Sequence, residues 1–200
     1  MSQVRVFLAG EGRNELGGRD GDTAYVGDDP GIIESLLRRV RGDGWTVTGA
    51  IQWKNIRKYR AQGPTPAEEH NVLGLAHEAR RASADVVAFI RDADNDPERP
   101  ATIDRAILKA RSEFPTLGVI GGTAVRAIEA WILALLGTRR SEHLTKPRAR
   151  AQLAERGLSH TQAMVGVVLE SDLTRMPDDA KALRTWLLAA DEVLGFHCSR

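Results

Sequence analysis

Short apolar runs alternate with longer amphipathic stretches through the first two thirds of the chain. Each apolar run predicts a short buried strand, and apolar residues three and four positions apart predict a helix with one buried face. The predicted strands cover about 3–9, 45–51, 85–91 and 116–120. The predicted helices run from Asp29-Pro30 to about Val40, and over about 66–82, 102–112 and 124–136. This alternation predicts an α/β fold with a mostly parallel four-stranded sheet flanked by helices.

The pattern becomes all-helical beyond Gly137. Helices are predicted at about 147–156, 161–169 and 178–194. We therefore expect an α/β core over residues 1–137 and a helical C-terminal extension over 138–200 that packs on this core. The apolar faces of the last helices could serve the core or a dimer surface, so the sequence leaves the oligomeric state open, with a homodimer as one option.

Carboxylates follow two of the predicted strands directly. Glu11 and Gly12 come after the first strand, and Asp92-Ala93-Asp94 comes after the third. Ligands bind at the carboxyl ends of the strands in open α/β sheets, so these side chains are expected to converge if the two strands are neighbours. Like charges a few ångströms apart need a counter-charge, and hard cations such as Mg²⁺ take oxygen ligands. The sequence therefore predicts a Mg²⁺ or Mn²⁺ site at this edge of the sheet.

Two further carboxylates are candidates for the same site. Glu15 lies four residues after Glu11 and could supply another metal ligand. Glu129 lies in the apolar stretch Ala127–Ile132, where a buried carboxylate needs a partner. It is therefore a metal ligand or a support of the site, an exposed residue at a bend, or the partner of Arg126. The complete predicted metal set is Glu11, Glu15, Asp92, Asp94 and Glu129.

This acidic set favours metal-dependent hydrolysis of a phosphodiester. In that hypothesis Asp92 and Asp94 hold the metal, which polarises the phosphate and lowers the pKa of bound water. Glu11 ligates the metal or moves a proton, so the predicted catalytic residues are Glu11, Asp92 and Asp94. Gly12 has no side chain and would let the phosphate backbone approach closely.

Positive charge gathers outside the acidic centre, although the net charge of the 200 residues is only +1. Four basic residues in the loop after the second strand are predicted to follow the phosphate backbone of a nucleic acid. They are Lys54, Arg57, Lys58 and Arg60. Trp53 or Tyr59 in the same loop could stack on an unpaired base, and packing in the core or anchoring of the loop explains them at least as well.

Cysteine content and hydropathy indicate the compartment. The single cysteine, Cys198, excludes a disulfide framework or a cysteine-based zinc site within one chain, which fits a reducing environment. The sequence enters a strand directly, without a charged-then-apolar leader. Its longest apolar stretch, Ala127–Gly137, contains Glu129 and is too short to span a bilayer. We therefore expect a cytoplasmic protein without membrane contact.

The two acidic motifs together resemble the Toprim fold, which type II topoisomerases, bacterial primases, small ribonucleases and OLD-family nucleases share. The resemblance rests on Glu11-Gly12 and Asp92-Ala93-Asp94, and the second glutamate, Glu15, is most similar to the OLD type. The stretch 127–134 with Lys146-Pro147 resembles small stand-alone Toprim-like bacterial proteins, some of which are effectors of anti-phage defence. The resemblance implies a Toprim-like core and a nuclease that acts on DNA or RNA.

The chain also departs from that pattern. A long loop rich in Gly and Asp follows the first motif, and Asp96 adds a third alternate carboxylate. No Gly-x-x-x-x-Gly-Lys-Ser/Thr motif occurs, so nucleotide-driven control would come from a separate ATPase or regulatory partner.

Three other functions can be compared with the nuclease. An EF-hand loop fails because Pro97 and Ile103 stand where that loop requires glycine and glutamate. A phosphatase with Asp92 as nucleophile leaves Glu11-Gly12 unexplained. The main alternative is a catalytically silent module that binds metal or nucleic acid and works with a partner protein.

Overall fold

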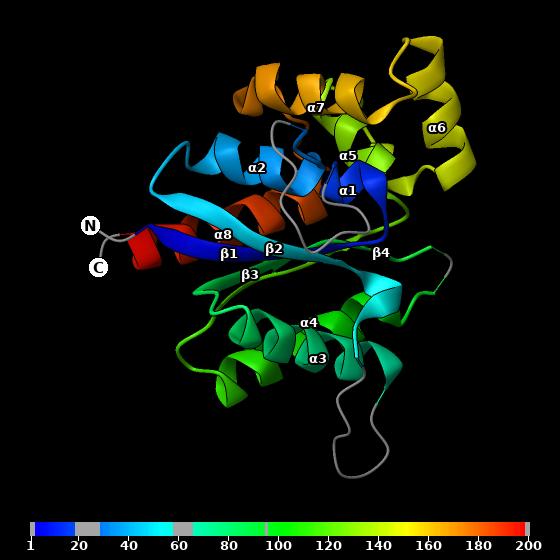
Figure 1. The fold of residues 1–200 in the computed structure, drawn as a ribbon. Coiled ribbons are helices and arrows are strands. Elements are labelled where there is room, and N and C mark those ends of the chain that lie inside the picture. The colour runs from blue at the N-terminus through cyan, green and yellow to red at the C-terminus, as the bar shows by residue number, and fades with distance from the viewer. Residues whose placement is uncertain (1–2, 19–28, 58–65, 95, 199–200) are drawn as a thin grey trace.

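The computed structural model describes residues 3–18, 29–57, 66–94 and 96–198 (Figure 1). Its main sheet has four strands, all parallel, in the order β2-β1-β3-β5. The strands are β1 (Val4–Gly10), β2 (Trp45–Gln52), β3 (Val86–Phe89) and β5 (Gly118–Ile120). The predicted α/β fold with a mostly parallel four-stranded sheet is confirmed at this level.

The central strands are mostly apolar because helices cover both of their faces. In β1, six of seven residues are buried, and all four residues of β3 are buried. Such continuous apolar runs are typical of parallel strands inside α/β sheets. β1 and β3 pair directly from Val6 with Val86 to Ala9 with Phe89. The two strands that precede the acidic motifs are therefore neighbours, which is the condition for the two motifs to form one site.

Helices α3 (Ala67–Arg81) and α4 (Arg99–Glu113) cover one face of the sheet, below it in Figure 1. They bury Leu73, Ile103 and their neighbours against the side chains that β1 and β3 send to this face. α4 begins at Arg99, three residues before the predicted start, because Pro100 fits the first turn of a helix instead of preceding it.

The helices α2, α5, α6, α7 and α8, together with the short α1 (Arg13–Leu16), lie on the opposite side of the sheet (Figure 1). α2 and α8 are nearest to the strands, and α5, α6 and α7 lie beyond or beside them. One continuous apolar cluster joins this sheet face to all of these helices. The division at residue 137 stays a prediction, since parts of both predicted segments contribute to that cluster. The bounds are α2 (Ile32–Val40), α5 (Ile128–Leu135), α6 (Lys146–Glu155), α7 (Thr161–Glu170) and α8 (Lys181–Cys198).

The predicted strand over 85–91 is divided in the structure. β3 ends at Phe89, and the chain then forms β4 (Arg91–Asp92), which pairs in parallel with β6 (Thr123–Ala124). The carbonyl of Phe89 accepts a hydrogen bond from the indole N–H of Trp186 at 3.0 Å, so α8 satisfies this carbonyl where the chain leaves the main sheet. β6 also explains why α5 begins at Ile128 and not near residue 124.

Several short elements occupy segments that the sequence pattern assigned to loops. The first acidic motif continues into α1 (Arg13–Leu16), whose Leu16 is fully buried. Three single 3₁₀ turns follow elsewhere, at η1 (Trp53–Asn55), η2 (Ser141–His143) and η3 (Leu173–Arg175). None of the helices described is both long enough and apolar enough to cross a membrane.

Candidate active site

Glu11 and Asp92 lie side by side at the carboxyl ends of β1 and β3. The backbone N–H of Asp92 donates a hydrogen bond to Glu11 Oε1 at 3.1 Å. Asp92 is almost completely buried and its Oδ1 accepts from the backbone N–H of Ile128, at the start of α5, at 2.9 Å. The two acidic motifs are therefore in direct contact, although 81 positions separate Glu11 from Asp92.

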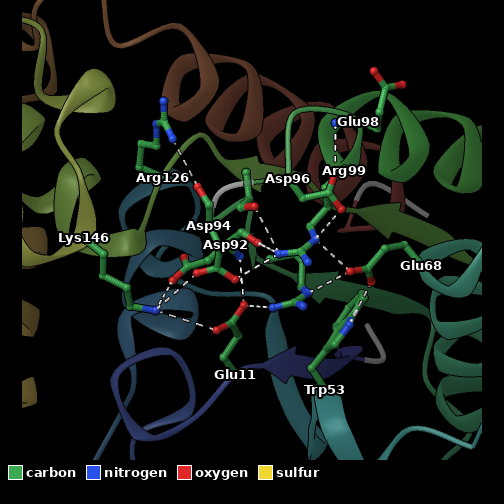
Figure 2. A network of polar contacts seen from close by, with 12 residues as sticks. Glu11, Trp53, Glu68, Asp92, Asp94, Asp96, Glu98, Arg99, Arg126 and Lys146 are labelled. Carbon is green, nitrogen blue, oxygen red and sulfur yellow. Dashed lines mark hydrogen bonds and ion pairs between the residues drawn. The ribbon is translucent and has the colours of Figure 1, made fainter.

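Lys146 supplies a positive charge at the centre of these carboxylates (Figure 2). Its Nζ lies 2.7 Å from Asp92 Oδ2, 3.9 Å from Glu11 Oε2 and 4.0 Å from Asp94 Oδ1. Lys146 is the first residue of α6, so an element of the C-terminal third completes the site.

The pKa values of this lysine and its partner reflect the shared burial. Burial raises the pKa of Asp92 above its usual range, against the hydrogen bond and charge of Lys146, which lower it. For Lys146, burial acts to lower the pKa, but the hydrogen bond and charge of Asp92, with further charge from Glu129, raise it above the ordinary value. The ammonium is therefore fully charged at neutral pH and neutralises part of the acidic centre.

Two arginines, Arg91 and Arg99, bind the other side of the acidic motifs. Arg91 forms an ion pair with Glu11 Oε1 and a second one with Glu68 of α3 at 3.3 Å. Its guanidinium carbon lies 5.6 Å from the ring centre of Trp53, a cation–π contact. Glu68 in turn accepts a hydrogen bond from Trp53 Nε1 at 3.1 Å. This network connects Glu11 to α3.

Arg99 fixes the turn that presents Asp94. It donates to the carbonyls of Asp92 and Ala93 at 2.9 and 3.2 Å and to Asp94 Oδ2 at 3.0 Å. Asp94 has a φ of 52°, in the left-handed region that aspartate tolerates better than most residues. Arg99 also lies 2.9 Å from Glu68, so one carboxylate of α3 binds both arginines.

Glu15 is buried beside the acidic centre, and the pKa of its carboxyl is raised. Its Oε2 accepts a hydrogen bond from the N–H of Gly12 at 3.0 Å, which fixes the side chain over the first acidic motif. Burial, with the nearby charges of Asp92 and Glu129, raises the pKa of Glu15 to about 7.

Glu129 is also buried, with 2% of the residue exposed, so the sequence-based option of an exposed residue at a bend is wrong. Its Oε1 accepts a hydrogen bond from Arg150 Nε of α6 at 2.7 Å. That bond raises the pKa of Arg150. Arg150 is thus a partner of Glu129 that the sequence did not suggest, and α6 again provides the positive charge.

The chemistry of these donors suits a hard divalent cation. Glu11, Asp92 and Asp94 offer carboxylate oxygens, which are the ligands that a hard cation such as Mg²⁺ takes. Burial, with smaller contributions from neighbouring carboxylates, raises the pKa values of Glu15 and Asp92. In the described part of the chain, no three carboxylate, histidine or cysteine side chains are already grouped as ligands to one metal. Lys146 is the cation closest to Asp92 Oδ2, so metal binding at this oxygen requires the ammonium to move.

The basic loop lies only partly within the described residues. Lys54 and Arg57 are exposed, whereas Lys58 and Arg60, like Tyr59, fall outside the described part. A hollow of about 420 Å³ lies where this loop meets the acidic centre, lined by Lys54, Arg91 and Glu11 among others. Trp53 is 6% exposed and its ring packs at 5.4 Å from that of Phe89, so it anchors the loop in the core.

Comparison with protein-family models, with curated proteins and with solved structures finds no significant match. No family membership follows from these comparisons. The argument for function therefore rests on the geometry of the acidic centre.

Sequence reasoning missed four residues of this centre, each for a recognisable reason. Arg91 and Arg99 flank the second motif and could have been flagged as cations next to a run of aspartates. The sequence marked Lys146 only as one of several basic residues and as part of a resemblance, because its contact with Asp92 spans 54 positions. Glu68 lies on an ordinary amphipathic helix, and no local pattern distinguishes it from a surface glutamate.

Proposed function

We propose that this chain is a metal-dependent nuclease that hydrolyses phosphodiester bonds of DNA or RNA. One observation carries the proposal: the ammonium of Lys146 lies within 4.0 Å of three carboxylates, Glu11 after β1 and Asp92 and Asp94 after the adjacent parallel strand β3. Ligand sites of open α/β sheets lie at this edge. A phosphodiester is a substrate that needs both charges, because carboxylates bind its metal and a lysine binds its oxygens.

The proposed roles follow from the contacts. Glu11, Asp92 and Asp94 would hold Mg²⁺ or Mn²⁺, which supplies a polarising charge and a nucleophile from bound water. Lys146 would bind a non-bridging phosphate oxygen with an ammonium that stays charged at neutral pH. Arg91 and Arg99 keep Glu11 and the turn of Asp94 in place.

A Toprim-type core is the fold relationship that we propose for this site. It is supported by the parallel strand order around β1 and β3 and by the position of both acidic motifs at their ends. A role in anti-phage defence and control by a separate ATPase partner are further proposals that rest on the sequence resemblance alone.

The test is cleavage of supercoiled plasmid, single-stranded DNA and tRNA with Mg²⁺ or Mn²⁺. Wild type is compared with Glu11→Gln and Asp92→Asn, which keep the size of each side chain, and with Glu113→Gln, an exposed residue at the end of α4. We expect cutting that requires the metal, falls at least about 100-fold in both site variants and is unchanged in the control. Activity that survives both site substitutions would refute the assignment.

A specific observation favours a second candidate, a catalytically silent binding module. Glu11 and Asp92 are already neutralised by Arg91 and Lys146, so the centre is stable without a metal. A module of this kind would bind nucleic acid through Lys146 and the basic loop without cutting it. Metal-independent binding in the absence of any cleavage would support this candidate over the nuclease.

A further inference from the structure

A second hollow adjoins the acidic centre on the side of α6 and α7. It has a volume of about 410 Å³. Leu153, Leu158 and Met164 supply an apolar lining, while Glu129 and Arg150 supply charge. Nothing in the proposed hydrolysis uses this space.

The hollow is connected to the proposed site of hydrolysis. A smaller hollow of about 290 Å³ is lined by Glu11 and Lys146 on one side and by Asn14, Glu129 and Arg150 on the other. The last three residues also line the larger hollow. A nucleotide whose phosphate lies near Lys146 can therefore place its base between α6 and α7.

The carboxylate of Glu129 is the unusual group in this hollow. Its side chain is 3% exposed and Oε1 accepts from Arg150. Oε2 is buried and has no hydrogen-bond partner among the described residues. A buried carboxylate oxygen without a donor is costly, so a ligand that brings an N–H group to Oε2 would gain the full benefit of that bond.

The shape and charge of the hollow select among ligands. Apolar side chains suit the faces of a flat ring, and a carboxylate suits an edge with two adjacent N–H donors. Guanine has such an edge in N1–H and the 2-amino group. Adenine and cytosine place a ring acceptor beside their amino group, which a carboxylate repels, and uracil or thymine offers one N–H between two carbonyls.

We propose that this hollow binds a guanine base of the nucleic-acid strand, with Glu129 accepting from N1–H and the 2-amino group. The proposal rests on the proposed nuclease function and gives it a base preference. It makes Glu129 a residue that recognises the base, in place of the metal ligand suggested by the sequence. The base must leave its stack to enter, so single-stranded or unpaired segments are the substrate.

The test measures binding and does not depend on cleavage. A fluorescent single-stranded oligonucleotide with one guanine in an adenine context is titrated with the full chain in EDTA, and its anisotropy is followed. The same oligonucleotide with inosine keeps N1–H and lacks the 2-amino group. We expect inosine to bind about tenfold more weakly than guanine, the value of one hydrogen bond to a charged group.

Three variants test the residues. Glu129→Gln keeps the shape but should reduce the guanine-to-inosine ratio to less than about twofold. Ala154→Phe, at an exposed position that lines the hollow, should weaken guanine binding by obstructing it. Glu155→Gln, the exposed neighbour on α6, should behave as wild type. Thermal unfolding of each variant separates loss of binding from loss of fold.

Each outcome decides the proposal. Equal binding of guanine and inosine oligonucleotides by wild type would overturn it, and so would a preference that persists in Glu129→Gln. If free GMP competes as tightly as the guanine oligonucleotide, the hollow takes a free nucleotide and the assignment to a strand is overturned. A guanine preference without metal-dependent cleavage on any substrate would support this inference while refuting the nuclease.

Discussion

At the scale of single residues, Glu15 shows how burial changes the chemistry of the first acidic motif. Its carboxyl is enclosed next to Asp92 and Glu129, and its pKa is raised to about 7 from an ordinary value of 4.5. Near neutral pH the protonated and the ionised forms of Glu15 are therefore both populated. A divalent cation in the centre would favour the ionised form.

Glu15 makes the stability of the metal-free protein depend on pH. Between pH 4.5 and 7 the folded chain keeps the proton that the unfolded chain has lost, so the free energy of unfolding falls as the pH rises through this window. The shift corresponds to about 3 kcal/mol. Urea unfolding in EDTA measures the free energy of unfolding at pH 4.5 and at pH 7.5. In Glu15→Gln the difference between these two values should be mostly lost. An equally steep dependence in the variant would contradict this origin.

At the scale of elements, the sequence predicted the positions of single strands better than the contacts between distant elements. Apolar runs located β1 and β2 almost to the residue. For β1 the reason is that a parallel strand covered on both faces requires such a run. The apolar run over 85–91 predicted one strand, but the structure divides it after Phe89. At that point the indole of Trp186, 97 positions away, donates a hydrogen bond to the Phe89 carbonyl. A tertiary hydrogen bond of this kind leaves no local signature.

The candidate site divides in the same way. The positions of Glu11 and Asp92 after apolar strands followed from periodicity alone. The lysine that binds Asp92 comes from α6, and the arginine that binds Asp94 comes from α4. Contacts between separate helices and a strand end depend on packing, which periodicity does not encode. The two acidic motifs were therefore predictable, and the contact of Lys146 with Asp92 was not.

The link between α6 and the strand ends gives a prediction at this scale. Lys146→Met removes the cation bound to the buried carboxylate of Asp92, and we expect a loss of about 2 kcal/mol in the free energy of unfolding. Lys109→Met is the matched control, because its ion pair with Glu69 is more exposed and should contribute less than about 1 kcal/mol. Urea unfolding without divalent ions measures both changes.

Divalent metal adds a second readout to the same comparison. If Mg²⁺ or Mn²⁺ binds where the ammonium lies, it should recover part of the stability that Lys146→Met loses. The Lys109→Met protein should gain no more than wild type. Equal gains in all three proteins would place the metal elsewhere.

At the scale of the whole molecule, the last third of the chain covers the sheet and completes the site. One apolar cluster extends from β1 and β3 to α7 and α8, and Lys146 and Arg150 provide the positive charge. The extension predicted over 138–200 is thus part of the core packing as well as of the acidic centre. This arrangement can be tested by dividing the chain.

A fragment of residues 1–137 should not fold on its own. It would expose the sheet face that α8 covers and leave Asp92 and Glu129 without Lys146 and Arg150. We expect no cooperative transition in urea and no protection of the β1 and β3 amides from hydrogen exchange. A cooperative transition in the fragment would instead establish 1–137 as an independent domain.

The position of Lys146 along the chain also has a consequence for protein synthesis. A ribosome makes β1, β3 and both acidic motifs long before it reaches α6, and α8 comes later still. For most of translation the nascent chain therefore contains Glu11 but not yet Lys146, the lysine that lies next to the carboxylates of the folded site. The site that we propose for hydrolysis is therefore completed only when translation is nearly finished.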